Sequence, residues 1–263
     1  MKEKTKKIKS SRFVPAKKKV RVDSELVHRG LVQSRTKARA LIMSGKVFSG
    51  EKRILKAGDL IDKLCPLDIR GPEYPWVGRG GVKLDHGLSY FGLSPESRTC
   101  IDVGASTGGF THVLLENGAS RVYAIDVGYG QLADKLRNDP RIITMDRTNA
   151  RYINNQIVSD PISAIVCDAS FIGLKTILPA SLSLASSGCW LVALIKPQFE
   201  VGPSLVGRGG IVRDKKSRDD ACANIKNWIE SLRGWKVLGL TESPITGNNG
   251  NIEFLIAAEF NSI

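Results

Sequence analysis

The sequence predicts an α/β protein in which a doubly wound, largely parallel sheet follows a smaller α+β unit. First, strand-sized apolar runs alternate with helical stretches from Thr99 onward, which is the order of such a sheet. Second, several of these runs end on a carboxylate or a lysine, as expected where ligands bind beyond the carboxyl ends of strands. Third, the excess of positive charge is confined to the first quarter of the chain, which separates two regions by composition.

The charge distribution indicates the class of partner. The 263 residues carry a formal net charge of +13. Residues 1–66 hold 19 Lys or Arg against 6 Asp or Glu, whereas residues 67–263 hold 20 of each. A basic region of this kind favours an anionic polymer, because binding it releases counterions. We therefore expect nucleic acid as the partner.

Membrane binding and secretion are not expected. No apolar run approaches the ~20 residues of a membrane-spanning helix, and the lysine-rich start lacks the apolar stretch of a secretory signal. We expect a cytoplasmic protein. The five cysteines are widely spaced without a C-x-x-C pair, and the three histidines lack ligand spacing, so we expect reduced core thiols and no metal site.

The first quarter of the chain divides into an arm and a small folded unit. Residues 1–19 are too charged to fold alone and are interpreted as a basic flexible arm. Within residues 20–66, Asp23 is expected to cap a helix that Gly30 ends, and Ser34 a second helix that Gly45 ends. Short strand material follows up to the turn-rich connector, residues 67–81.

The connector contains aromatic and glycine motifs with two interpretations each. Tyr74 and Trp76 either stack on bases or, as we favour, pin two domains together. The tetrapeptide Gly-Arg-Gly-Gly occurs at residues 78–81 and again at residues 207–210. Both copies are either mobile loops that grip RNA phosphates or ordinary flexible loops. Residues 82–263 form the large domain, in which Lys83 opens an amphipathic helix.

The stretch from Thr99 to Asp126 reads as strand, glycine turn, helix and strand. Small residues in the turn let the backbone approach a ligand closely, and the helix start points free N–H groups at the same place. Asp126, at the tip of the second strand, is placed to accept hydrogen bonds from ribose hydroxyls. The order then continues through residues 141–145, 163–168, a helix at 174–185, a strand at 189–195, a helix capped by Asp214, and final strands at 235–240 and 252–260, the last antiparallel.

The turn favours S-adenosylmethionine over a nicotinamide cofactor. It reads G-x-x-x-G-G rather than G-x-G-x-x-G, successive strands end on acids, and the sheet finishes with a hairpin. Asp146 is equally compatible with an adenine contact and with an ordinary loop acid. The expected cofactor-binding residues are Asp102, Gly104, Ala105, Ser106, Thr107, Gly108, Gly109, Phe110, Asp126, Asp146 and Asp168.

Two lysines and two acids are expected to converge near the bound methyl group. Asp168 and Lys196 follow buried strands, Glu253 begins the last strand, and Lys83 arrives from the preceding helix. A lysine at the end of a buried strand needs a counter-charge or a lowered pKa, and both suit it to manage the proton of an alcohol. Considered singly, each is as compatible with an unrelated surface charge.

The chain resembles the TlyA-type ribosomal RNA methyltransferases, a branch of the FtsJ-like ribose 2′-O-methyltransferases with an S4-like RNA-binding domain ahead. The motifs are SRTKARALIMSGKV and KAGDLID in front, then GRGGVKLDHGL, DVGASTGGFT, YAIDVGYGQL, VCDASF, LIKPQFE and IVRD. The resemblance implies a Rossmann-like class I methyltransferase sheet, a Lys83-Asp168-Lys196-Glu253 tetrad, S-adenosylmethionine as cofactor, and ribosomal RNA or ribosomal subunits as partners. The expected RNA-facing residues are Arg35, Lys37, Arg39, Lys46, Arg79 and Arg208.

One motif departs from the family pattern. Family members commonly have an arginine shortly before the Trp-Val of the connector, where this chain reads Tyr74-Pro75-Trp76-Val77. Two rival functions are a non-catalytic ribosome-assembly factor, which loss of a tetrad residue would favour, and a cytolysin, which needs secretion and an apolar insertion element. The sequence shows neither feature.

Overall fold

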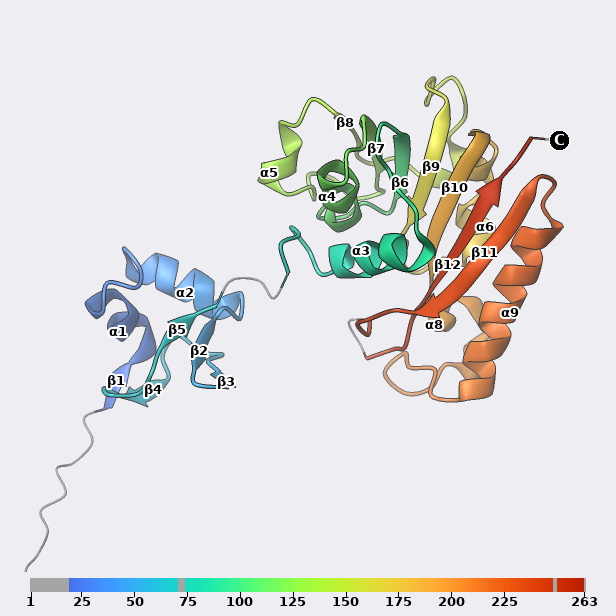
Figure 1. Ribbon diagram of the computed structural model, residues 1–263. Helices are drawn as coiled ribbons and strands as arrows, with labels where there is room; N and C mark the ends of the chain where they lie inside the picture. The colour runs from blue at the N-terminus through green and yellow to red at the C-terminus, as the bar shows by residue number, and fades with distance from the viewer. Residues whose placement is uncertain (1–18, 71–73, 248–249, 263) are drawn as a thin grey trace, which may run out of the picture. The chain divides into compact units, whose positions relative to one another are not determined.

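The computed structural model describes residues 19–70, 74–247 and 250–262 and divides into two units, Met1–Glu73 and Tyr74–Ile263 (Figure 1). The division falls inside the expected connector, residues 67–81. The expected basic arm lies outside the described residues except for Lys19, which belongs to a strand.

The smaller unit packs two helices on short strands. Its core contains Val22, Leu26, Ala38, Ile42 and Val47. Strand β1 pairs antiparallel with β4, and β2 pairs antiparallel with both β3 and β5. The unit extends past Pro66, because β5 pairs with β2. The elements are β1 (Lys19–Arg21), α1 (Val22–His28), α2 (Arg35–Met43), β2 (Val47–Ser49), β3 (Lys52–Arg53), β4 (Leu60–Asp62) and β5 (Asp68–Ile69).

Only one of the two caps expected in this unit is correct. The Ser34 side chain accepts a hydrogen bond from the Lys37 backbone N–H at 3.2 Å, so it caps α2. The expectation that Asp23 caps α1 is wrong. Helix α1 begins at Val22 with Arg21 at the N-cap position, and the Asp23 carboxylate is buried in its first turn, where it pairs with the Arg21 guanidinium.

The larger unit is built on a seven-stranded sheet with the order β11-β12-β10-β9-β6-β7-β8. Neighbouring strands are parallel except at β12, which runs antiparallel to both β10 and β11. The expected class I methyltransferase sheet with a reversed last strand is confirmed. The strands are β6 (Thr99–Val103), β7 (Arg121–Ile125), β8 (Ile142–Met145), β9 (Ile162–Cys167), β10 (Ala185–Ile195), β11 (Trp235–Glu242) and β12 (Phe254–Phe260).

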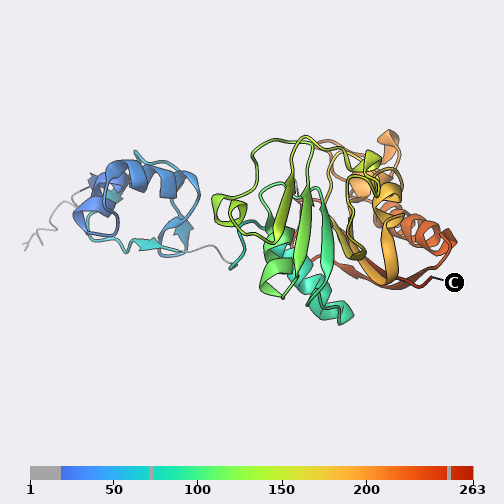
Figure 2. The same cartoon turned by 90° about the horizontal axis from the view of Figure 1, so that it is seen from above.

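Helices cover both faces of this sheet (Figures 1 and 2). Alternate residues of each central strand enter different cores: in β10, Leu191 and Ala193 belong to one core, whereas Trp190 and Val192 belong to the other. The first core includes side chains of α6 (Leu174–Ile177), α7 (Pro179–Leu182) and α9 (Lys215–Ser231), and the second those of α3 (Gly80–Phe91), α4 (Gly109–Glu116) and α5 (Asp134–Arg137). Four of the five free cysteines are buried.

Of two helices expected in this unit, one is split in the structure and the other has the expected N-cap. The expectation of a single helix at residues 174–185 is wrong. The segment forms two helices, α6 and α7, because Pro179 lacks a backbone N–H and begins a new helix. Ala185 already belongs to β10. The cap expected on α9 is confirmed, because the Asp214 carboxylate accepts the Ser217 N–H at 2.8 Å.

Candidate active site

The carboxyl ends of β6, β9 and β10 border a cavity of about 630 Å³. The reversed strand β12 has its start at this edge, so Glu253, which directly precedes it, also lines the cavity. Of the residues expected to act here, those that line it are Arg79, Lys83, Gly104, Ala105, Ser106, Thr107, Gly109, Phe110, Asp168, Lys196 and Glu253. Asp102, Gly108, Asp126, Asp146 and Arg208 lie outside its lining.

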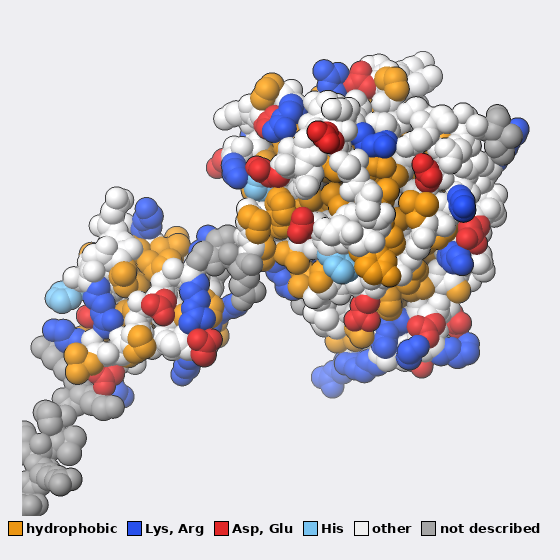
Figure 3. Space-filling view, viewed as in Figure 1, with side chains coloured by type: hydrophobic (Ala, Val, Ile, Leu, Met, Phe, Trp, Pro, Cys, Tyr) orange, Lys and Arg blue, Asp and Glu red, His pale blue; other side chains and the backbone are white. Residues whose placement is uncertain are grey.

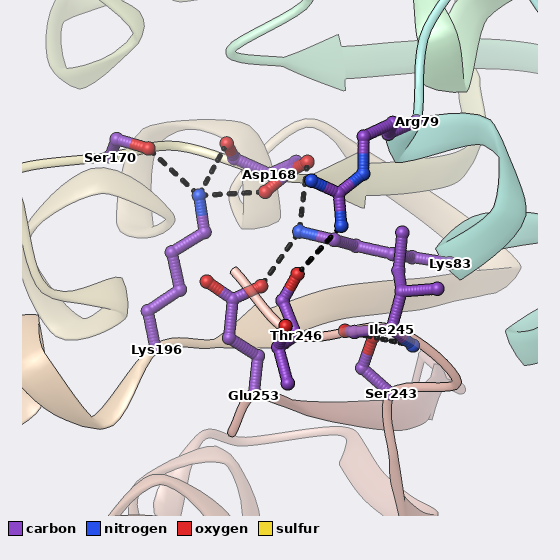
Figure 4. A network of polar contacts seen from close by, with 9 residues as sticks. All are labelled: Arg79, Lys83, Asp168, Ser170, Lys196, Ser243, Ile245, Thr246 and Glu253. Carbon is purple, nitrogen blue, oxygen red and sulfur yellow. Dashed lines mark hydrogen bonds and ion pairs between the residues drawn. The ribbon is translucent and has the colours of Figure 1, made fainter. Parts of the chain in front are cut away.

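The four tetrad residues form a chain of alternating charge (Figure 4). Lys196 Nζ lies 2.7 Å from Asp168 Oδ1, Lys83 Nζ lies 3.9 Å from Asp168 Oδ2, and Lys83 Nζ lies 2.6 Å from Glu253 Oε2. Lys83, Lys196 and Glu253 are buried. Because two ammonium groups face two carboxylates, each buried charge has a counter-charge.

The Lys196 ammonium has three oxygen partners. Besides the Asp168 carboxylate, it donates to the Asp168 backbone carbonyl at 3.1 Å and to Ser170 Oγ at 2.8 Å. An ammonium has three N–H donors and no acceptor, so these three oxygens match its donors in number. Sequence reasoning missed Ser170, although its position two residues beyond Asp168 placed it at the same strand end.

The glycine turn allows close backbone approach at two positions. Gly104 has φ +82°, and a Cβ added there would lie 3.0 Å from Ala169 Cα. A Cβ on Gly109, the first residue of α4, would lie 3.0 Å from the Gly81 backbone nitrogen. The turn is thus packed against the Asp168 loop on one side and the start of α3 on the other.

Three of the four acids expected to contact the cofactor, Asp102, Asp126 and Asp146, lie outside the cavity lining. Asp126 accepts the backbone N–H groups of Ser106 at 2.8 Å and Gly128 at 2.7 Å. Asp146 accepts the Gly130 N–H at 2.9 Å. Both carboxylates therefore order loops beside the cavity.

Asp102 is the most buried of these acids. Its Oδ2 accepts a hydrogen bond from Thr111 Oγ1 at 2.7 Å, and its Oδ1 has no hydrogen-bond partner within the described part of the chain. Burial raises the pKa of Asp102 to about 7, and the nearby charge of Asp168 adds to the shift, whereas the Thr111 hydroxyl opposes it. An unpartnered buried oxygen of this kind is a place for a cationic ligand group.

The segment before α3 contacts helix α4, which follows the glycine turn. The Val77 N–H donates to His112 Nδ1 at 3.2 Å, and the Trp76 ring meets the His112 ring edge-on at 5.5 Å. Gly80 and Gly81 form the first residues of α3, so the first Gly-Arg-Gly-Gly copy is half helix rather than a loop, and Lys83 lies in the first turn instead of opening the helix. The Arg79 guanidinium reaches across the site to donate to the Thr246 carbonyl at 3.3 Å (Figure 4).

The second Gly-Arg-Gly-Gly copy is held beside the tetrad. Asn251 donates to the Gly210 carbonyl at 2.8 Å and accepts the Val212 N–H at 3.0 Å. Arg208 itself is exposed. At the start of α9 nearby, Lys215 and Lys216 are exposed too, and basic side chains gather on the visible lower edge of this unit (Figure 3).

A pair of aromatic residues at the cavity, one of them exposed, was missed by sequence reasoning. Phe171 and Phe199 both line the cavity, with ring centroids 5.3 Å apart. Phe171 is 91% exposed and has φ +64°, a conformation that bulky residues rarely adopt. The two residues stand in the quoted motifs VCDASF and LIKPQFE, but the exposure of Phe171 depends on loop geometry that the sequence pattern does not reveal.

The residues expected to face RNA in the smaller unit differ in their surroundings. Lys37 is exposed and Lys46 is half-buried. Arg35 and Arg39 are exposed on α2, but both also approach the buried Asp23 carboxylate, at 2.9 and 3.5 Å.

Comparisons with known proteins point to one family. A model of the FtsJ-like methyltransferase family matches residues 76–260. The 16S/23S rRNA (cytidine-2′-O)-methyltransferase TlyA of Mycobacterium tuberculosis is 43% identical over 240 residues, 91% of this chain and 89% of that protein. Hemolysin A of Brachyspira hyodysenteriae is 41% identical over 238 residues, covering 90% of this chain and 98% of the relative. A solved structure of a Streptococcus thermophilus protein named as a hemolysin has 41% identity and a TM-score of 0.72, covering 94% of this chain and 90% of that one.

Proposed function

The chain belongs to the FtsJ-like methyltransferase family, and from this premise we propose that it transfers a methyl group from S-adenosylmethionine to a ribose 2′-hydroxyl of ribosomal RNA. The observation that carries the proposal is the Lys196–Asp168–Lys83–Glu253 chain at the wall of a cavity that also includes the glycine turn. The rRNA 2′-O-methyltransferase name of a relative at 43% identity supports the same reaction.

The residues of the turn fit S-adenosylmethionine. The crowding at Gly104 and Gly109 leaves room for backbone only, and the N-terminal N–H groups of α4 begin at this turn. The unpartnered Asp102 Oδ1 is suited to the cationic methionine portion, and Asp126 and Asp146 to the nucleoside. When bound, S-adenosylmethionine supplies a methyl group on a positively charged sulfur.

Lys196 would orient the acceptor. Its ammonium would donate to the ribose 2′-oxygen in exchange for Ser170 Oγ, because all three of its N–H groups already have oxygen partners. Positive charge beside this oxygen eases the loss of its proton by stabilising the oxyanion that forms. Asp168 and Glu253 would fix the positions of the two lysine ammonium groups through their ion pairs, and Lys83 would position the ribose. Much of the rate would come from this alignment.

The exposed face of the site suits RNA. Phe171 offers an aromatic surface on which a base can stack, and Arg79 and Arg208 offer guanidinium groups for phosphates. Two of the similar proteins carry the name hemolysin. Among the described residues, no helix combines the length and apolar character that a membrane span requires.

The direct test uses ribosomal subunits from a strain that lacks the enzyme, incubated with radiolabelled S-adenosylmethionine. We expect label in one or a few ribose 2′-positions, found by mapping the RNA. Lys236→Ala, at an exposed lysine of β11, is the matched control for Lys196→Ala and keeps full activity. Absence of label with both subunits and with naked RNA would contradict the proposal and favour the non-catalytic assembly factor.

A further inference from the structure

A buried carboxylate in the smaller unit gathers three arginines. Asp23 Oδ2 lies 3.0 Å from Arg21 Nη2, 2.9 Å from Arg35 Nη2 and 3.5 Å from Arg39 Nε. The Asp23 side chain has no exposed surface, whereas the three arginine side chains are 46%, 52% and 57% exposed. We call Arg21, Arg35 and Arg39 the arginine cluster.

The position of Asp23 is fixed by the backbone. Its N–H donates to the Ala57 carbonyl at 3.2 Å, and the Val22 N–H donates to the Asp59 carbonyl at 3.1 Å. The arginine cluster therefore joins side chains from β1 and from two successive turns of α2 around one fixed point. The Arg21 guanidinium, helped by that of Arg35, holds the pKa of Asp23 well below its usual range.

The cluster keeps most of its capacity to bind an anion. Three guanidinium groups and one carboxylate leave a net charge of +2. Each guanidinium has five N–H donors, and Asp23 engages two from Arg21 and one from Arg35. Guanidinium forks match phosphate oxygens in geometry, so the remaining donors suit RNA backbone phosphates.

We propose that Asp23 is a positioning residue that holds the arginine cluster ready for the backbone phosphates of RNA. The inference rests on the proposed function, because it assumes that the smaller unit binds the RNA that the larger unit methylates. Without the shared carboxylate, three like charges would repel one another and each side chain would have to be ordered at the moment of binding. The opposite interpretation is that Asp23 only neutralises arginines that would otherwise bind RNA better.

Asp23→Asn separates these interpretations by the sign of its effect, because it preserves the shape of the side chain while removing one negative charge, which raises the net charge of the unit by one. Affinity for ribosomal subunits is measured in the full-length protein between roughly 50 and 200 mM KCl. We expect binding to weaken about tenfold, since the cluster loses its anchor. Asp68→Asn, at an exposed acid of the same unit, adds the same charge and leaves affinity unchanged or higher. Unchanged or tighter binding by Asp23→Asn overturns the inference.

A second variant keeps the test decisive if Asp23→Asn fails to fold in thermal melts. Arg35→Lys preserves charge at an exposed position but replaces the fork by a point charge. We expect several-fold weaker RNA binding, because a lysine cannot present a guanidinium fork to a phosphate. Where Asp23→Asn does fold, the effect of Arg35→Lys should be smaller in that background, because the two changes disrupt one arrangement. Wild-type affinity in Arg35→Lys overturns the inference. Methyl transfer by the wild-type protein is a separate readout, and its absence would contradict the proposed function instead.

Discussion

Lys196 Nζ lies 2.7 Å from Asp168 Oδ1, while Lys83 Nζ lies 3.9 Å from the other oxygen of the same carboxylate. Asp168 is therefore shared by two lysines that reach it from opposite sides, one from the end of β10 and one from α3. The two lysines differ in their other partners. Lys83 is held mainly by Glu253, whereas the remaining partners of Lys196 are a carbonyl and a hydroxyl, which a ribose oxygen can replace.

Lys196→Ala should abolish methyl transfer while leaving affinity for S-adenosylmethionine within a few-fold, because the residue would act on the acceptor oxygen. We expect a loss on the order of 10³-fold in turnover. Titration calorimetry gives the affinity and labelled-methyl incorporation gives the rate, with Lys236→Ala as control. A parallel collapse of cofactor affinity would contradict the assignment.

Two substitutions at Phe171 should separate the effect of its backbone strain on stability from the effect of its ring on RNA binding. Its φ of +64° costs on the order of 1 kcal/mol for a non-glycine residue. Phe171→Gly relieves this strain and Phe171→Ala does not, so we expect the glycine variant to be the more stable of the two in denaturant unfolding, by about 1 kcal/mol. Because both variants remove the ring, both should raise the KM for RNA about tenfold and leave affinity for S-adenosylmethionine unchanged. An unchanged KM for RNA would remove Phe171 from the acceptor site.

The largely parallel sheet with its reversed last strand and the convergence of the tetrad could be predicted because both follow from periodicity and chain direction. Parallel strands bring Asp168 and Lys196 to one edge, and the reversal of β12 brings Glu253 to the same edge. The role of Asp23 could not be predicted, because a carboxylate at a helix start is usually a cap, and its partner Arg35 lies twelve residues away on another helix. Phe171 was missed for a similar reason, since its exposure belongs to the conformation of the loop after β9, where its φ is +64°.

Gly104→Ala tests whether the turn needs a bare backbone. Gly104 and Gly188 have similar φ values, +82° and +79°, but a Cβ at Gly104 would lie 3.0 Å from Ala169 Cα, whereas one at Gly188 would meet nothing within 4 Å. Both alanine variants bear the cost of the left-handed conformation, so the difference between them isolates the crowding. We expect Gly104→Ala to be less stable than Gly188→Ala by about 1–3 kcal/mol in denaturant unfolding and to bind S-adenosylmethionine at least tenfold more weakly. Equal stabilities would show that the Asp168 loop yields to a methyl group.

Asp102 should make the ligand-free protein less stable as pH rises. Burial, aided by the charge of Asp168, raises the pKa of its carboxyl to about 7, whereas an unfolded chain has an Asp pKa of about 3.9. Between these values the folded state binds the extra proton, so the free energy of unfolding falls as pH rises through this window, and the loss is complete above the folded pKa. The side chain in Asp102→Asn cannot ionise, and its single amide oxygen can still accept the hydrogen bond from the Thr111 hydroxyl.

The stability difference between Asp102→Asn and wild type should therefore shift in favour of the variant between pH 5 and 8, by on the order of 1 kcal/mol per pH unit below the folded pKa. Denaturant unfolding of both proteins at four pH values measures it, and the other titrating groups cancel in the difference. Because the proposed cofactor site sets the cationic methionine portion against Asp102, saturating S-adenosylmethionine should favour the ionised carboxylate and reduce the shift. A difference that stays constant with pH would mean that Asp102 is already charged in the folded protein, and the unpartnered Oδ1 would then need a cation even before the cofactor binds.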